Sequence, residues 1–335
     1  GSGWCWGRNT SGELGDGTRV SSTTPVRAVT LTDAMEISTG HSHTCARHAG
    51  GGVSCWGNNA NDRLGLGDTG PPSVAEPARL TAIGMAVSIS AGLDATCAAI
   101  MDGSVRCWGN NANGQLGVDR TMLPSASEPT LVPGVTSAVG VSVGAAHACS
   151  VIGTGQIWCW GRDLEGQIGN GPGDEVDAVG PNIVTLSGAD VVSAGAAHTC
   201  ALDRMGRIWC WGAGTRGELG DGRSMSSPSP VEVPPFGEPW LQIAAGNIVT
   251  AARTGSRTWS WGGGPALGSS SGRAGPGFVD PPLMGASDVS IGSGHGCAIT
   301  SDGQPLCWGA NSDGQLGDGS MDPSVSPVAV VLPAP

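Results

Sequence analysis

The feature that most restricts the fold of this chain is a unit of about 50 residues that returns seven times. Each copy centres on a Trp-Gly pair, and successive tryptophans are 47 to 52 residues apart. The seven tryptophans are Trp6, Trp56, Trp108, Trp160, Trp211, Trp261 and Trp308. Self-similarity at such a period indicates a solenoid, a propeller or a repeat array. We therefore expect residues 1–335 to form one domain of similar, stacked units.

The composition of the unit favours short β-strands. A strand-like segment ends in Gly and is followed by a His-Thr-Cys-Ala type segment, a turn often marked Asp-Gly, and Cys-Trp-Gly. A Pro-rich stretch completes the unit. Four short strands per unit fit a propeller blade, whereas the rungs of a β-solenoid are shorter, and 58 glycines exclude helical repeats. The fold class predicted is all-β, a β-propeller of four-stranded antiparallel blades.

The two halves of the unit occur in unequal numbers. The Trp-Gly half is present seven times, and the upstream His-Thr-Cys-Ala half only six times. The partner of Cys5 would lie ten residues before it, ahead of Gly1. Propellers remove exposed sheet edges by combining strands from both termini in one blade. We expect seven blades, one of them incomplete in this chain.

Ten of the 11 cysteines form pairs with one common separation of ten residues. A three-residue hairpin loop such as Met101-Asp102-Gly103 would place the two members opposite each other, within disulfide range. The predicted disulfides join Cys45 with Cys55, Cys97 with Cys107, Cys149 with Cys159, Cys200 with Cys210, and Cys297 with Cys307. Buried free thiols and a metal site remain as alternatives, although zinc would need four ligands and a unit offers at most three.

One degraded unit supplies an internal test of the pairing. Counted back from Trp261, the two cysteine positions hold Thr250 and Ser260, so both partners are missing together. Loss of both cysteines together is what a disulfide bridge predicts. Five bridges, each adding about 2 to 3 kcal/mol, indicate an oxidising compartment.

Two further signals are interpreted as parts of the repeat. Residues 212–217 match G-x-G-x-x-G, but they occupy the same turn as residues 7–12 and 109–114, and no helix is expected there. We therefore expect no nucleotide and no other cofactor. The recurring histidine (His43, His147, His198 and His295) is expected to hydrogen-bond backbone within or between blades, without a catalytic or metal-binding role.

The net charge of −12 argues against a nucleic-acid partner, which requires Lys and Arg to neutralise phosphates. No apolar run approaches the ~18 residues needed to span a bilayer, so no membrane insertion is expected. The chain has no Lys and no Tyr, two residues with AT-rich codons, which indicates a high-GC bacterial genome.

The unit as a whole resembles the regulator of chromosome condensation repeat, and the match covers essentially the entire chain. This resemblance implies a seven-bladed propeller closed by strands from both termini. The family's founding member is a guanine-nucleotide exchange factor for a small nuclear GTPase, and it also docks on nucleosomes. The wedge loop and the basic tail behind those activities are not recognisable here, and the chain looks more like secreted bacterial members.

The functional hypothesis is a non-catalytic protein-binding or scaffold module, monomeric and extracellular, on the cell surface or periplasmic. Four variable stretches are expected to form binding loops, residues 66–80, 171–182, 223–240 and 268–282. Phe236 and Trp240 lie outside the repeat positions and are the candidate partner contacts. The alternatives are an exchange factor like the family founder, and an enzyme with histidines and carboxylates converging at the channel mouth.

Overall fold

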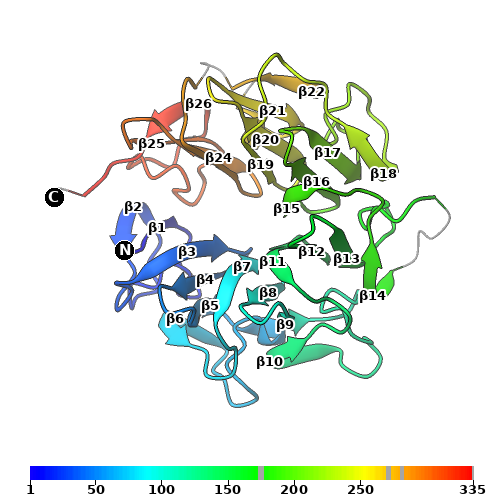
Figure 1. Cartoon of the computed structure of the whole chain (residues 1–335). Helices are drawn as coiled ribbons and strands as arrows, with labels where there is room; N and C mark the ends of the chain where they lie inside the picture. Colours follow the sequence, from blue (N-terminus) through cyan, green and yellow to red (C-terminus); the bar gives the residue numbers. More distant parts are fainter. Residues whose placement is uncertain (173–176, 269–272, 280–282, 334–335) are drawn as a thin grey trace.

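The computed structural model describes residues 1–172, 177–268, 273–279 and 283–333. These residues form separate antiparallel sheets arranged in a ring (Figure 1). Two short 3₁₀ turns, η1 (Ala60–Asp62) and η2 (Pro265–Leu267), are the only helical elements in the part of the chain described. The all-β propeller with four-stranded antiparallel blades is confirmed.

Each complete blade takes four consecutive strands, numbered from the centre of the ring outwards. The first comprises β3 (Ala34–Thr39), β4 (His43–His48), β5 (Val53–Asn58) and β6 (Ser73–Arg79). The second comprises β7 (Ala86–Ala91), β8 (Ala95–Ile100), β9 (Val105–Asn110) and β10 (Ser125–Leu131). The third comprises β11 (Ala138–Val143), β12 (His147–Ile152), β13 (Ile157–Gly161) and β14 (Ala178–Ile183).

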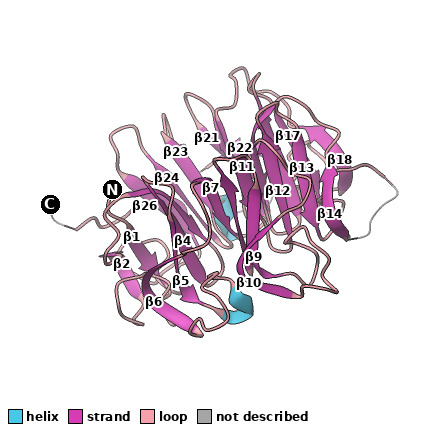
Figure 2. Cartoon of the chain, turned by 60° about the horizontal axis from the view of Figure 1, so that its bottom comes forward, coloured by secondary structure: helices cyan, strands magenta, loops and turns pink. Residues whose placement is uncertain are grey.

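The other three complete blades follow the same order. The fourth comprises β15 (Ala189–Ala194), β16 (His198–Asp203), β17 (Ile208–Gly212) and β18 (Ser227–Glu232). The fifth comprises β19 (Gln242–Ala245), β20 (Val249–Arg253), β21 (Thr258–Gly262) and β22 (Arg273–Phe278). The sixth comprises β23 (Asp288–Ile291), β24 (His295–Ile299), β25 (Pro305–Gly309) and β26 (Ser324–Ala329). The loops gather at the two faces of the ring (Figure 2).

The number of blades differs from the seven that the sequence predicted. Six four-stranded blades are present in the described residues, together with one two-stranded sheet, β1 (Trp4–Gly7) and β2 (Ser22–Arg27). The physical reason is the unequal count of half-units. The first Trp-Gly element has no His-Thr-Cys-Ala segment before it in this chain, so β1 lacks the strand that pairs with its counterparts.

Every repeat tryptophan ties its own sheet to the preceding one. The indole Nε1 of Trp160 donates to the carbonyl of Gln115 at 2.9 Å, and Trp56, Trp108, Trp211, Trp261 and Trp308 make the corresponding bonds. Trp6 donates to the carbonyl of Gln315, also at 2.9 Å, and thereby joins the first repeat to the last. All of these indoles except that of Trp6 are fully buried. The core of the ring is thus a set of interfaces between neighbouring sheets.

The hairpin register agrees with the cysteine spacing. Cys97 lies directly opposite Cys107, and the loop between them closes with Gly103 at φ +84°, as predicted for a three-residue turn. The degraded repeat is an exception. Its hairpin has the two-residue loop Gly255-Ser256, which is closed by a hydrogen bond from the backbone N–H of Thr254 to the carbonyl of Arg257.

The shorter loop corrects one prediction from the sequence. Ser260 lies opposite Ala251, and Thr250 lies opposite Trp261. The missing cysteine pair therefore corresponds to Ala251 and Ser260, whereas counting along the sequence selects Thr250. Both positions of the pair still lack cysteine together, so the argument from joint loss is unchanged.

Candidate functional site

A cleft lies at the two-stranded sheet. It has a volume of about 280 Å³ and is bounded by three parts of the ring. The β1–β2 unit contributes Trp4, Cys5, Trp6, Gly7, Arg8, Glu13 and Leu14; the first complete blade contributes Ile37, Thr39, Gly40, His41, Ser42, His43 and Thr44; the sixth contributes His295, Cys297 and Gln315. We call this the half-blade cleft.

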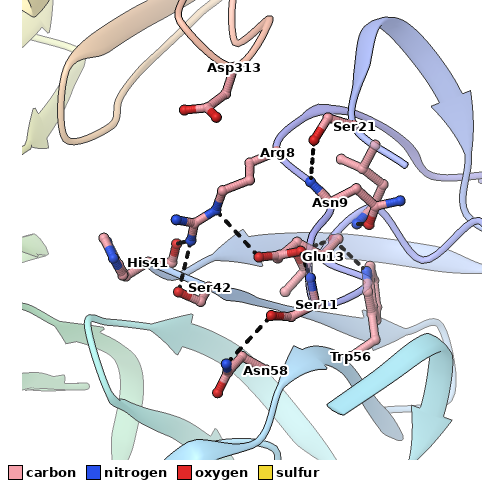
Figure 3. Close-up of polar contacts among 12 residues, drawn as sticks. Arg8, Asn9, Ser11, Glu13, Ser21, His41, Ser42, Trp56, Asn58 and Asp313 are labelled. Atoms are coloured by element: carbon pink, nitrogen blue, oxygen red, sulfur yellow. Dashed lines mark hydrogen bonds and ion pairs between the residues drawn. The ribbon is translucent and has the colours of Figure 1, made fainter. Parts of the chain in front are cut away.

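The polar rim of the half-blade cleft is organised by Arg8 (Figure 3). Its Nη2 donates to the carbonyl of His41 at 3.0 Å and to the hydroxyl of Ser42 at 2.9 Å. Its Nε lies 3.4 Å from a carboxylate oxygen of Glu13. The other oxygen of Glu13 accepts from the backbone N–H of Ser11 at 2.7 Å. Arg8 thus fastens the β1–β2 loop to the first complete blade.

The apolar wall of the cleft is more exposed than its counterparts elsewhere in the ring. Ile37 on β3 is 38% exposed. The same position on the other innermost strands is held by Ile89, Val141, Val192, Ile243 and Val289, all between 2% and 8% exposed. In each complete pair of blades the innermost strand lies beside the innermost strand of the preceding blade. The cleft is the place where that strand is absent.

Cys5 is the one free cysteine among the described residues, as the pairing predicted. The five predicted disulfides are all formed, each between directly opposed residues with Cα atoms 4.1 Å apart. Burial, followed by the neighbouring charge of Asp16, raises the pKa of the Cys5 thiol to about 12. Cys5 therefore lies in the cleft as a neutral thiol. Within the described ranges no group of three His, Cys, Asp or Glu side chains could hold a metal ion.

Three of the four recurring histidines join neighbouring blades through a threonine hydroxyl, whereas a backbone partner was expected. Nε2 of His147 lies 2.8 Å from the hydroxyl of Thr199, which itself donates to the carbonyl of Gln167 at 2.9 Å. Because the hydroxyl proton is committed to that carbonyl, the imidazole must donate from Nε2. His43 and His198 make the same contact with Thr96 and Thr250.

These histidines are held neutral by their surroundings. Burial lowers the pKa of His43 and of His147 to about 3, with smaller contributions from Arg63 at His43 and from His198 at His147. Burial alone lowers the pKa of His198 to about 4. Their partners are hydroxyls and not carboxylates, so none of the three is poised for acid–base chemistry near neutral pH. They act as neutral connectors between blades.

Side chains of Ser54, His48 and Asp33 lie together at the β4–β5 hairpin of the first complete blade. This arrangement was not predicted from the sequence. Nδ1 of His48 lies 2.5 Å from a carboxylate oxygen of Asp33, and Nε2 lies 2.8 Å from the hydroxyl of Ser54. The spacing resembles a hydrolase triad. Ser54 is only 1% exposed, however, so its hydroxyl has no access to a substrate carbonyl. The contact fastens the turn and offers no reaction site.

The two candidate partner contacts lie together in one aromatic cluster. Phe236 is 41% exposed, and its ring centroid lies 4.6 Å from that of Trp259 and 6.1 Å from that of Trp240. Trp240 is only 2% exposed and also contacts Trp261, at 6.1 Å between centroids. Phe236 is therefore the surface member of this cluster, and Trp240 lies beneath it.

The four stretches expected to be loops prove to be only partly loops. Three of them contain the outermost strand of a blade, β6, β18 or β22, and residues 171–182 contain all of β14 except Ile183. Proline is tolerated there because an edge strand leaves alternate N–H groups unpaired; β18 has the sequence SPSPVE. Residues 173–176, 269–272 and 280–282 of these stretches lie outside the described residues. None of the described helices is long and apolar enough to cross a membrane.

A ring of antiparallel four-stranded sheets, tied together by one tryptophan per repeat, defines the class of protein: a repeat-built β-propeller. The RCC1-like domain model matches residues 2–334. The chain belongs to this RCC1-like domain family.

Several proteins are similar to it. The ultraviolet-B receptor UVR8 of Arabidopsis thaliana is 30% identical over 94% of this chain and 74% of the receptor. The E3 ubiquitin-protein ligase HERC2 of Homo sapiens is 28% identical over 97% of this chain, which corresponds to only 7% of the ligase. Yeast RCC1 (Prp20), solved bound to Kap60, superimposes with a TM-score of 0.84 at 20% identity, over 98% of this chain and 83% of that one. The last similarity bears on the fold alone.

Proposed function

We propose that this chain is a non-catalytic protein-binding module of a bacterium, working on the cell surface, in the periplasm or outside the cell. The observation that carries the proposal is the set of five cross-strand disulfides at repeat positions. Disulfides of this kind persist where the surroundings are oxidising. The buried serine Ser54 and the neutral histidines support a role without catalysis.

We further infer one propeller domain with seven positions around its ring. The Trp6 bond to Gln315 is equivalent to the bonds between complete blades and supports placing the β1–β2 sheet at the seventh position. In this arrangement β1 and β2 are the two outer strands of the incomplete blade. We propose that the chain is monomeric and binds no nucleic acid, in keeping with its net charge of −12.

The partner contact is proposed at Phe236, with Trp240 supporting its ring from below. An exposed aromatic ring over a rigid aromatic base is a common anchor in protein interfaces. Relatives also suggest protein partners: Prp20p of Saccharomyces cerevisiae was solved in work on its binding to Gsp1p and histones.

The test compares partners captured by the purified chain and by its Phe236→Ser variant from the secreted and cell-surface fractions of the source bacterium. Met122→Ser is the matched control, since Met122 is 83% exposed and lies in another blade. Loss of a partner with Phe236→Ser, but not with Met122→Ser, supports the proposal. Accelerated release of labelled GDP from a small GTPase would instead favour the exchange-factor alternative.

A further inference from the structure

The methionines of this chain lie on its surface without exception. The eight residues are between 50% and 83% exposed: Met35, Met85, Met101, Met122, Met205, Met225, Met284 and Met321. Methionine is ordinarily among the residue types most often buried, because its flexible thioether fills irregular gaps in a core. The hydrophobic core of the described residues is instead built from Ala, Cys, Ile, Leu, Trp and Val. Packing therefore does not explain why these eight positions hold methionine.

The methionines are distributed over the two faces of the ring at which the loops gather (Figure 2). Five lie at the face where the second strand of a blade ends and the innermost strand begins: Met35, Met85, Met101, Met205 and Met284. Three lie at the opposite face, in the loops that lead into the outermost strands of the second, fourth and sixth blades: Met122, Met225 and Met321. Both faces of the ring therefore present thioether sulfurs to solvent.

The repeat itself does not require methionine at these places. In the second blade the backbone N–H of Met101 donates to the carbonyl of Met85 at 2.8 Å. In the third blade the N–H of Gly153 makes the same bond to the carbonyl of Ser137 at 2.9 Å. The turn therefore closes equally well with residues that carry no sulfur. What methionine adds at such an exposed position is a thioether, which oxidants convert to a sulfoxide.

The other oxidisable groups are less accessible than the methionine sulfurs. The repeat tryptophans of the six complete blades are fully buried, and so are both cysteines of four of the five disulfides. Burial raises the pKa of Cys5 to about 12, so it is not the thiolate that oxidants attack. Trp4, at 42%, is the most exposed tryptophan of the chain. An oxidant from solvent therefore meets the thioethers first and Trp4 next.

We propose that the eight methionines are sacrificial oxidation sites, which reduce oxygen-transfer oxidants such as hypochlorous acid at the protein surface before those oxidants reach tryptophan. The inference goes beyond the proposed binding function and does not depend on the partner contact at Phe236. Eight sulfurs give the chain a capacity of eight equivalents of a two-electron oxidant. Such a reserve suits a protein that works in oxidising surroundings.

The reaction at each site is an oxygen transfer. The oxygen of hypochlorous acid passes to the thioether sulfur, so that an S–O bond forms and the O–Cl bond breaks. Chloride leaves with the electron pair of the broken bond, and the proton is released to water. Sulfur loses two electrons and chlorine gains two, so the step is balanced and yields one methionine sulfoxide for each oxidant molecule consumed.

The fold can accept all eight sulfoxides. A sulfoxide is polar, and in a core it disrupts packing because its oxygen is removed from water. At positions that are at least half exposed the new oxygen stays hydrated. Complete conversion should therefore leave the near-ultraviolet circular dichroism unchanged and move Tm by less than about 3 °C.

The experiment titrates the full 335-residue chain, with its disulfides intact, with hypochlorous acid. Intact mass counts the oxygen atoms added, and peptide mapping follows the methionine sulfoxides and Trp4 separately. The parent is compared with an eight-site variant in which leucine replaces every methionine. A five-site variant replaces only the methionines of the first face, and a three-site variant replaces only those of the opposite face. Near-ultraviolet circular dichroism verifies the folding of each protein before the titration.

The proposal predicts that Trp4 stays intact until the remaining sulfurs are consumed, after about eight equivalents in the parent, about three in the five-site variant and about five in the three-site variant. In the eight-site variant Trp4 should be oxidised from the first equivalent. The two partial variants keep the test decisive if the eight-site variant does not fold.

Oxidation of Trp4 from the outset in the parent would overturn the inference, and so would the same delay in the parent and the partial variants. Loss of the near-ultraviolet signal of the parent before all eight methionines are converted would overturn it as well, because the sulfoxides would then damage the fold that they are proposed to protect.

Discussion

A sixth disulfide can be built into the fifth blade, and its position tests the register of the whole repeat. Ala251 and Ser260 are directly opposed, both are fully buried, and they occupy the positions that hold bonded cysteines in the other five complete blades. The double variant Ala251→Cys/Ser260→Cys should therefore oxidise to a bridge without movement of the backbone.

The expected gain in stability is small but measurable. Closing a loop of about ten residues adds about 2.7 kcal/mol by the chain-entropy estimate. The substitution also removes the hydrogen bond from the Ser260 hydroxyl to the carbonyl of Leu267, at 2.5 Å, which costs about 1 kcal/mol. The net gain of about 1.7 kcal/mol corresponds to a rise in Tm of about 2 °C for a chain of this length.

The assay combines thiol counting with thermal unfolding of the oxidised proteins. The double variant should retain one alkylatable thiol, Cys5, and melt above the parent. The matched control is Thr250→Cys/Ser260→Cys, the pair selected by counting along the sequence. It should show three free thiols, because Thr250 faces Trp261. A bridge in the control and none in the first variant would refute the register described here.

Three other perturbations test the packing and the absence of catalysis. The pKa of His147 is about 3 in the folded protein, whereas an unfolded histidine protonates near pH 6.5. The contribution of neutral His147 to the free energy of unfolding is therefore complete above pH 6.5 and is lost as the pH falls, by about 2 to 3 kcal/mol at pH 4.5. His147→Gln should reduce the number of protons taken up on unfolding by up to about one, which flattens the dependence of unfolding free energy on pH. An unchanged slope in acid denaturation would contradict this assignment. Trp160→Phe should cost about 1 to 3 kcal/mol in urea unfolding, because it leaves the buried carbonyl of Gln115 unpaired; Trp158→Phe, at a partly buried position in the same strand, is the control with the smaller loss. A fluorophosphonate probe should not label Ser54 in the folded protein, and labelling abolished by His48→Ala would revive the enzyme alternative.

The sequence was most informative where the repeats agree. The ten-residue cysteine spacing is a direct consequence of a three-residue hairpin loop, so the spacing alone predicts all five bridges correctly. The prediction failed for Thr250, where one residue fewer in the loop shifts the register. The two-residue Gly255-Ser256 turn could have been predicted, because Gly-Ser between two strand-like runs favours a tight hairpin.

Contacts between distant repeats could not be predicted in the same way. The hydroxyl partners of His43, His147 and His198 come from the next blade, 52 or 53 residues away, and only the packing of the two sheets brings each pair together. The burial of Trp240 beneath Phe236 also depends on tertiary packing. The half-blade cleft had one sequence signal, the unpartnered Cys5, but its walls come from three separate parts of the ring.

The measurement that tests the central claim most directly is a count of free thiols in the protein isolated from its source without reducing agents. The denatured, unreduced chain is alkylated, and its intact mass is read. A disulfide-stapled propeller from an oxidising compartment predicts one modified cysteine, Cys5. Eleven modified cysteines would show that no bridge forms, and would contradict both the extracellular location and the role proposed from it.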